Sequence, residues 1–475
     1  MIAIKPTRLI LTSGIRCESI RSAFFSLEVG PPVRSVPQTR QRLAFSEIFV
    51  PQTGQTRVFA GCGSDCIFFI FYSFTIETTD HRFGKIMSMS AVYFHIPFCV
   101  KRCYYCDFIT YAEQGHLMAA YQDAMLKELK FSQKFEIEPI TSLYFGGGTP
   151  SLLPADYVAE LIRTSEEYFG FEPETEVTLE ANPGTLDLDK LNDLRIAGGN
   201  RLSLGVQSFD DSDLKVLGRV HTAAQAEEAI ALARQTGFEN ISLDFIFGLP
   251  GQNLEGWQRN LAMAVETGVE HLSLYSLILE EDTVFAQMVA RNELILPEDD
   301  LVADMFELAM DFLPSKGYQQ YEISNWSRGA VFESRHNKVY WKNLDYLGIG
   351  AAAHGKLGET RYNNIETIPL YIERLKQPDD KKSNFSPAVK ETTPISQQDA
   401  INEHMILGLR MTSKGISAPD FKIRYGQVLE TVFMTRIEKL IDIGLLEWVD
   451  FDDGRHLRLT RRGIMLGNRV FQEFI

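Results

Sequence analysis

Three cysteines between residues 93 and 108 carry the most distinctive chemistry in this chain of 475 residues. The stretch YFHIPFCVKRCYYCDF places Cys99, Cys103 and Cys106 in a C-x3-C-x2-C pattern, directly after an apolar run that predicts a strand. Three thiolates on one short loop can wrap a single metal centre. A tetrahedral zinc site would need a fourth Cys or His at similar spacing, whereas a cubane iron-sulfur cluster can use three thiolates and leave one iron open.

No fourth ligand of that kind follows the three cysteines. Position 108, where a further thiolate could sit most easily, is Phe108, and the nearest histidines are His95 and His116. The pattern therefore favours a [4Fe-4S] cluster with one exchangeable position. Zinc and unliganded thiols are the alternatives.

The elements around this loop alternate between strand-like and helix-like patterns. Apolar runs predict strands at 91–98, 142–148, 176–182, 201–207, 240–247 and 271–279. Helical periods lie between them, and one has a capping box at Thr222 and Gln225. This alternation indicates parallel strands with right-handed crossovers, and the absence of a convincing seventh and eighth unit predicts an incomplete (β/α)6 barrel over residues 89–375.

Two further segments follow the predicted barrel. Residues 376–396 are polar and contain proline, which predicts a linker. Residues 397–475 read as helices, two strands around Asp453-Gly454 and a last helix, the outline of a small winged-helix-like α+β domain. Such domains sometimes bind DNA, but the acidic surroundings favour a structural or substrate-covering role.

Charge and composition limit the kinds of partner that the protein can bind. The formal net charge is −16, and the residues after position 88 hold 37 basic against 57 acidic side chains, which argues against a nucleic-acid partner. The longest apolar run is too short to span a bilayer. Because the clustered cysteines need reduced thiolates, we expect a reducing, cytoplasmic location.

Residues 1–88 differ from the rest and predict an atypical N-terminal extension. The first 44 residues hold seven basic and two acidic side chains, which is typical of a targeting segment for an organellar matrix. The favoured alternative is an upstream extension of the reading frame with a natural start at Met87 or Met89. A C-x3-C pair at Cys62 and Cys66 lacks further ligands nearby, so we expect no second metal site there.

The strand ends carry polar residues where the barrel would open. The second predicted strand ends in a Gly-Gly-Gly-Thr-Pro turn at 146–150, whose glycines let backbone N–H groups approach a ligand. Glu180, Gln207 and Asp244 break the next apolar runs, and Arg219 follows in LGRVH. Each could serve only to cap a helix or close a hydrogen-bond network, but reactive groups of parallel barrels gather at this edge.

The stretch Y-x-H-I-P-F-C-x3-C-x-Y-C-D-F resembles radical S-adenosylmethionine (radical SAM) proteins, and within them the group of oxygen-independent coproporphyrinogen III oxidases and HemW-type haem chaperones. The resemblance runs from about Tyr93 to the C-terminus and implies a radical SAM barrel. It implies that the three cysteines bind a [4Fe-4S] cluster whose open iron takes S-adenosylmethionine. The contacts implied for S-adenosylmethionine are Tyr93, Tyr105, Gly147, Gly148, Thr149, Glu180, Gln207, Arg219 and Asp244.

A second motif, H-N-x-x-Y-W at 336–341, matches the segment associated with haem in HemW-type proteins. An imidazole is a good axial ligand for haem iron, so the resemblance makes His336 the candidate ligand and His354 a weaker one, although a histidine beside Tyr and Trp is often simply hydrogen-bonded. The oxidases carry C-x3-C-x2-C-x-C, and Phe108 replaces that last Cys.

Together these features favour a haem chaperone that passes haem to an acceptor protein. The alternatives are a coproporphyrinogen III oxidase and a radical SAM enzyme acting on an unrelated substrate. The resemblance further implies an electron donor and a scaffold able to cleave S-adenosylmethionine reductively.

Overall fold

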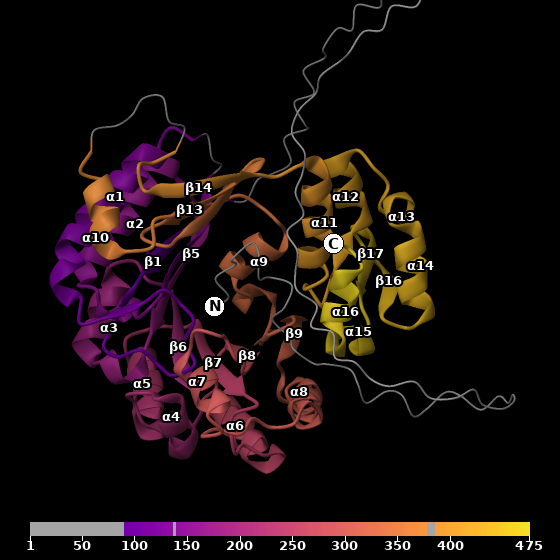
Figure 1. Cartoon of the computed structure of the whole chain (residues 1–475), viewed down its shortest axis with the longest axis horizontal. Helices are drawn as coiled ribbons and strands as arrows, with labels where there is room; N and C mark the ends of the chain where they lie inside the picture. Colours follow the sequence, from indigo (N-terminus) through magenta and orange to yellow (C-terminus); the bar gives the residue numbers. More distant parts are fainter. Residues whose placement is uncertain (1–89, 136–138, 378–384) are drawn as a thin grey trace, which may run out of the picture. The chain divides into compact units, whose positions relative to one another are not determined.

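The computed structural model describes residues 90–135, 139–377 and 385–475 (Figure 1). The predictions for residues 1–88, including Cys62, Cys66 and a start at Met87 or Met89, lie outside the described residues. Within the described part, no helix combines the length and apolar character that crossing a bilayer requires.

A twelve-stranded sheet forms the centre of the larger domain, in the order β14-β13-β12-β11-β1-β4-β5-β6-β7-β8-β10-β9. Its parallel part contains β11 (Tyr346–Ile349), β1 (Ser90–Ile96), β4 (Ile140–Gly147), β5 (Phe171–Ala181), β6 (Arg201–Gln207), β7 (Ile241–Phe247) and β8 (His271–Ser276). Antiparallel strands extend both edges: β10 (Asn325–Ser327) and β9 (Gln319–Glu322) on one, and β12 (His354–Leu357), β13 (Thr360–Asn364) and β14 (Val389–Pro394) on the other. The six predicted strands are confirmed to within a few residues.

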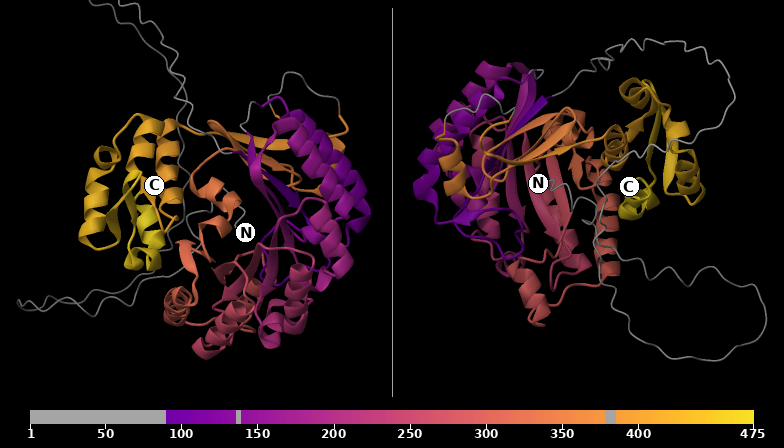
Figure 2. Two further views of the ribbon diagram at one scale, coloured as in Figure 1. Left: turned by 180° about the vertical axis from the view of Figure 1, so that it is seen from behind. Right: turned by 45° about the horizontal axis from the view of Figure 1, so that its top comes forward.

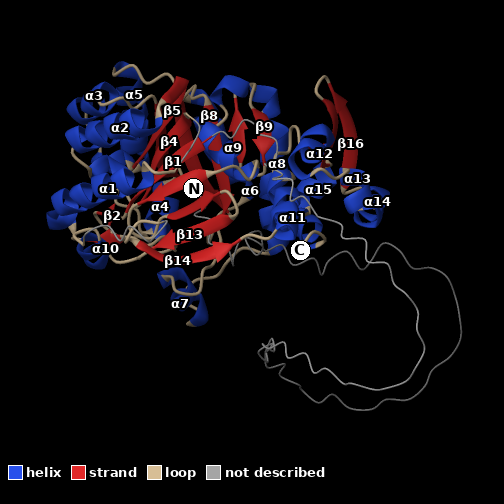
Figure 3. Ribbon diagram, turned by 90° about the horizontal axis from the view of Figure 1, so that it is seen from above, coloured by secondary structure: helices blue, strands red, loops and turns tan. Residues whose placement is uncertain are grey.

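Helices cover the outer face of this sheet, as Figure 3 shows for α1, α2, α3 and α5. They are α1 (Met118–Ser132), α2 (Ala155–Phe169), α3 (Leu188–Ile196), α5 (Ala223–Gln235) and α6 (Leu254–Glu266), with α8 (Asp299–Phe312) and α10 (Ile368–Arg374) further along the chain. The predicted capping box of α5 is present, since Thr222 and Gln225 bond each other's backbone N–H groups. One apolar core joins these helices to the strands, which confirms the incomplete barrel class.

Two strands depart from the predicted organisation. β11 is a seventh parallel strand beside β1, and its four residues are too few to give a recognisable pattern. β14 lies inside the predicted linker 376–396; its side chains are almost all exposed, so it belongs to the sheet through backbone pairing with β13 alone. Figures 1 and 2 show β14 (orange) running toward the C-terminal domain (yellow), antiparallel to β13.

The C-terminal domain has the predicted winged-helix outline. Its three-stranded sheet has the order β15-β17-β16, with β15 (Ile416–Ser417), β17 (Gly454–Leu459) and β16 (Leu446–Phe451). Its helices are α11 (Gln397–Gly408), α12 (Ala418–Tyr425), α13 (Leu429–Val432), α14 (Met434–Asp442), α15 (Arg461–Met465) and α16 (Gly467–Gln472). A separate apolar core holds them together, so the domain has its own hydrophobic centre.

The short helix α9 (Arg335–Trp341) lies on the opposite side of the sheet from α1 and α2 (Figure 1). It contains the H-N-x-x-Y-W segment. Val339, Tyr340 and Trp341 pack with Ala91 of β1 and with Leu407 of α11, so the helix contacts both the barrel and the C-terminal domain.

Candidate functional site

The cysteine loop leaves β1 and is tied down at both ends. Its first cysteine, Cys99, belongs to the two-residue strand β2 (Phe98–Cys99), which pairs in parallel with β3 (Tyr111–Ala112). In the middle of the loop, the Tyr104 N–H donates to the Leu217 carbonyl at 3.1 Å. These backbone hydrogen bonds hold the irregular cysteine loop in one conformation.

His95 anchors the far side of the same loop. Its Nε2 lies 2.9 Å from the Ile109 carbonyl oxygen, and its Nδ1 lies 3.0 Å from the Tyr93 hydroxyl. A carbonyl can only accept, so Nε2 carries the proton and Nδ1 accepts from Tyr93. Burial lowers the pKa of His95 to about 4, which keeps this neutral tautomer at physiological pH.

The three cysteine sulfurs face one cavity and have polar neighbours. The Thr149 hydroxyl lies 3.7 Å from Cys99 Sγ, and the Arg219 guanidinium donates to Cys103 Sγ at 3.4 Å. Burial raises the pKa of the Cys99 thiol and raises that of Cys106 to about 11. A bound metal centre would offset this penalty because its positive charge stabilises thiolates.

The described ranges hold no three His, Cys, Asp or Glu side chains grouped closely enough to share one metal ion, so the fit to a cluster rests on the three cysteines that line one cavity. Gly148 leaves space beside the loop, since a Cβ atom there would lie 3.0 Å from Cys99 Sγ and 2.6 Å from the Phe98 carbonyl. Bulk at this point would displace the loop.

The glycine turn after β4 presents its backbone to the cavity. Gly147 has a φ of 111°, a conformation that side chains disfavour, and a Cβ atom there would lie 2.5 Å from the His95 ring. Its N–H donates to Glu180 Oε2 at 3.0 Å, and the Tyr144 hydroxyl donates to Glu180 Oε1 at 2.9 Å. Burial, with Asp244 nearby, raises the pKa of Glu180.

The ends of β6 and β7 contribute the next polar groups. Gln207 has a φ of 66°, which is unusual outside glycine, at a register shift between β6 and β7. The Ser203 hydroxyl donates to Asp244 at 3.1 Å, which orients that carboxylate along the cavity wall. Arg219 donates to the Gly205 carbonyl at 2.7 Å as well as to Cys103, so it joins the β6 end to the cysteine loop.

All the predicted cluster and S-adenosylmethionine residues line a single cavity of about 350 Å³. They are Tyr93, Cys99, Cys103, Tyr105, Cys106, Gly147, Gly148, Thr149, Glu180, Gln207, Arg219 and Asp244. The cavity lies at the carboxyl ends of the parallel strands, where such barrels place their chemistry. It therefore brings three thiols and two carboxylates within reach of one ligand, whereas the N–H groups of the glycine turn already donate within the protein.

The two candidate haem ligands lie in different places. His354 lines the cavity at the start of β12. His336 is fully buried beneath it and does not line it; its Nδ1 lies 3.0 Å from the Ser142 hydroxyl and its Nε2 2.8 Å from that of Tyr340. Burial lowers the pKa of His336 to about 3, so the ring is neutral and both its nitrogens are engaged.

Several cavity residues were missed from the sequence. Tyr275 on β8 and Ser203 on β6 line the wall, as do Tyr346 and Ala352; Tyr340, which the motif at 336–341 already contained, lines it too. Tyr275 and Ser203 interrupt apolar strands as Glu180 and Asp244 do, but Tyr and Ser are common in strands and gave no separate signal. Tyr275 falls in the middle of the predicted strand 271–279, whereas β8 ends at Ser276 and so places Tyr275 at the cavity.

Comparison with known proteins agrees with this geometry. The radical SAM superfamily matches residues 93–264, and the HemN C-terminal domain matches residues 395–466. The solved coproporphyrinogen III oxidase (HemN) from Escherichia coli shares the fold, with a TM-score of 0.69 and 24% identity over 82% of this chain and 90% of that one. Fold, cysteine loop and cavity thus define the class of radical SAM proteins, which implies a [4Fe-4S] cluster and S-adenosylmethionine.

Sequence similarity to curated relatives identifies a family within the radical SAM class. Heme chaperone HemW from Lactococcus lactis is 39% identical over 81% of this chain and 97% of its own length, and that from Bacillus subtilis is 36% identical over 82% and 99%. The mitochondrial radical S-adenosyl methionine domain-containing protein 1 of Mus musculus is 33% identical over 79% of this chain and 85% of its own. The chain belongs to the HemW heme chaperone family.

Proposed function

We propose that this protein binds haem and transfers it to an acceptor protein. The observation that carries this proposal is the similarity to proteins named heme chaperone HemW, which extends over 97% of the Lactococcus lactis protein. A cavity that continues from the cysteine loop to the aromatic side chains of Tyr340 and Tyr346 supports it, because aromatic rings can pack against a porphyrin.

In this proposal Cys99, Cys103 and Cys106 hold the [4Fe-4S] cluster, and the Gly147-Gly148 turn binds S-adenosylmethionine. When bound, cluster and S-adenosylmethionine together supply one-electron cleavage of a carbon–sulfur bond. The role of the chain's own residues is to position and shield them. Glu180 and Asp244 supply acceptors for donor groups of the ligand, and Arg219 neutralises negative charge beside Cys103.

His336 is the proposed haem ligand, and it requires a change of conformation. Its two ring nitrogens contact Ser142 and Tyr340, so neither can bind iron until one of these bonds breaks. His354, which lines the cavity, is the second candidate. The two assignments differ in mechanism, because only the first makes haem binding depend on movement of α9.

The alternative function is oxidation of coproporphyrinogen III. The likeness to the HemN fold favours it, whereas Phe108, which stands where the oxidases carry a further cysteine, argues against it. Both functions use the same cavity, so activity has to separate them.

The test is an anaerobic assay on protein reconstituted with iron and sulfide. One portion receives reductant, S-adenosylmethionine and coproporphyrinogen III, and porphyrin products are followed by mass spectrometry. A second portion is titrated with haem and followed by its Soret band. The variant with all three cysteines changed to Ala is the control without a cluster, and His336→Ala and His354→Ala report on the ligand.

Stoichiometric haem binding without porphyrin conversion is the expected result, with a Soret band altered by His336→Ala. Formation of protoporphyrinogen IX would make the protein an oxidase despite Phe108. A chain that binds no haem would exclude the chaperone. A Soret band changed only by His354→Ala would transfer the ligand role to that residue.

A further inference from the structure

The helix that carries His336 is held at its N-terminal end by the barrel. The carboxylate of Glu176, on β5, accepts hydrogen bonds from the N–H groups of Arg335 at 3.0 Å and His336 at 3.2 Å. Glu176 is 6% exposed, so water hardly competes for these bonds. This end of α9 is therefore a fixed part of the larger domain.

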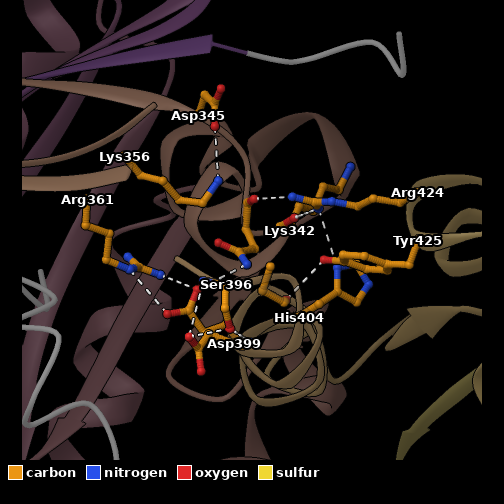
Figure 4. A network of polar contacts seen from close by, with 12 residues as sticks. Lys342, Asp345, Lys356, Arg361, Ser396, Asp399, His404, Arg424 and Tyr425 are labelled. Carbon is orange, nitrogen blue, oxygen red and sulfur yellow. Dashed lines mark hydrogen bonds and ion pairs between the residues drawn. The ribbon is translucent and has the colours of Figure 1, made fainter. Parts of the chain in front are cut away.

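The C-terminal end of the same helix is held by the other domain. Arg424 of α12 donates to the carbonyl of Lys342 at 2.8 Å and to that of Asn343 at 2.6 Å, directly after the last turn of α9. Figure 4 shows Arg424 reaching from the C-terminal domain toward Lys342. Carbonyl groups at the C-terminal end of a helix lack intrahelical hydrogen-bond partners. The Arg424 guanidinium supplies partners for two carbonyl groups directly after α9.

A second contact converges on the same turn. The side-chain amide of Asn343 donates to Glu403 of α11 at 3.4 Å, and Glu403 pairs with Arg361 of β13 at 2.6 Å. Asn343 is buried and has a φ of 50°, so the turn after α9 adopts a conformation that surrounding contacts must maintain. Arg361 is labelled in Figure 4, with dashed lines from its guanidinium.

Side chains of the C-terminal domain also pack against α9 itself. The guanidinium of Arg410 lies 4.5 Å from the centre of the Trp341 ring, and Met411 packs in the same apolar cluster. Tyr340, beside Trp341, bonds to His336 and lines the cavity. Contacts thus run without interruption from the C-terminal domain to the imidazole.

The two ends differ in how easily they can open. The Glu403 side chain is 29% exposed and Arg424 is half-buried, whereas Glu176 (6% exposed) and Arg410 (8%) are both buried. Half-exposed polar contacts are the ones that water and partner groups can replace, and regions held by them open first. The contacts of Arg424 and Glu403 are consequently the ones at which release of α9 can begin.

We propose that the C-terminal domain is a latch on α9: Arg424, Glu403 and Arg410 keep His336 buried and bonded, and release of these contacts frees its imidazole to bind haem iron. This inference rests on the proposed haem-binding function and adds its regulation. A ligand that selects the open state binds with an affinity reduced by the fraction of open molecules. Weakening the latch therefore raises the apparent haem affinity.

The experiment uses the full chain and anaerobic titration with haem b. Arg424→Ala removes the two carbonyl contacts, and Lys422→Ala, an exposed cation on the same helix, is the matched control. We expect Arg424→Ala to lower the apparent Kd about tenfold, as the loss of one or two charge-assisted hydrogen bonds predicts. Lys422→Ala should bind haem with the wild-type apparent Kd. The double variant Arg424→Ala with His336→Ala should lose the gain in haem affinity.

Hydrogen–deuterium exchange without haem provides an independent readout. Amides of residues 338–344 should exchange faster in Arg424→Ala than in wild type or Lys422→Ala. If Arg424→Ala fails to fold, Arg424→Lys takes its place, since an ammonium serves the two carbonyls less well and should shift both readouts in the same direction.

The outcomes separate the latch from the function on which it rests. Equal haem affinity in wild type and Arg424→Ala overturns the latch, as does a gain that persists without His336. Absence of haem binding in every variant overturns the proposed function instead. In that case the hydrogen–deuterium exchange of residues 338–344 alone shows whether Arg424 holds α9. Equal exchange in wild type and Arg424→Ala would overturn the latch as well.

Discussion

At the scale of single residues, the site depends on close backbone approach as much as on reactive side chains. The cysteine loop, the glycine turn and His95 are closely packed, so a Cβ atom added to a glycine of the turn would clash with its neighbours. Gly148 shows this most clearly. A Cβ atom there would meet the Ile96 carbonyl at 2.9 Å as well as the Phe98 carbonyl and Cys99 Sγ.

We therefore expect Gly148→Ala to push the loop away and lower the iron retained after anaerobic reconstitution, with a loss of about 1–3 kcal/mol in folding stability typical of overpacking. Iron per chain, measured beside an unfolding curve, checks this. Gly115→Ala is the control, because its Cβ would meet only the Met118 methyl at 3.9 Å. Wild-type iron content in Gly148→Ala would show that the loop can move aside.

At the scale of elements, a buried carboxylate joins parts of the barrel that are distant in sequence. Glu128 of α1 accepts hydrogen bonds from the Gly350 N–H at 2.9 Å, Asn364 at 2.7 Å, Tyr371 at 2.5 Å and Ser386 at 3.1 Å. These donors come from the turn after β11, the end of β13, α10 and the segment before β14. The carboxylate thereby fixes the turn that leads to the cavity wall.

Burial raises the pKa of Glu128 to about 7, from an ordinary value of 4.5. Between these values the folded protein binds a proton that the unfolded chain does not, so this group favours folding below about pH 4.5 and loses that contribution as pH rises to 7. Glu128→Gln cannot titrate. Its free energy of unfolding, relative to wild type, should increase by up to about 3 kcal/mol from pH 4.5 to 7.5.

Urea unfolding at several pH values measures this difference. Asp123→Asn, which removes an exposed carboxylate from the same helix, is the matched control. Parallel pH profiles for wild type and Glu128→Gln would mean that the buried group keeps its ordinary pKa.

The elements also show what the sequence could predict. The six longer parallel strands were found because each is a continuous apolar run, as buried parallel strands require. β11 and β14 were missed because one is short and the other has no buried face, and both depend on pairing with neighbours. The cysteine loop was predictable from spacing, but the burial of His336 was not, since its partner Ser142 lies 194 residues earlier.

At the scale of the whole molecule, several histidines are held neutral in the interior. Burial lowers the pKa to about 4 for His95 and His221 and to about 3 for His336 and His404. The unfolded chain binds these protons near pH 6.5 and the folded protein does not. The contribution of these histidines to folding stability is thus fully present above pH 6.5 and is lost as pH drops toward 4, by about 1.4 kcal/mol per pH unit for each histidine.

Unfolding midpoints between pH 7 and 5 should show this decline. In a plot of the free energy of unfolding against pH, His221→Gln should lower the slope by about one proton, which is about 1.4 kcal/mol per pH unit. His116→Gln, which changes an exposed histidine, is the matched control. A slope that is the same in all three proteins would assign acid sensitivity to other groups.

The pairing of β1 with β11 has a consequence for the time at which the site forms. Ala91 lies beside Tyr346, and the next residues of β11 lead to Ala352 and His354 in the cavity wall. A growing chain therefore emerges with its cysteines long before the strand that completes their surroundings. Contacts across such a sequence separation form slowly, so the cysteines lack their complete surroundings until β11 has paired with β1. Assembly of the metal centre is thus expected to follow translation of the barrel rather than accompany it.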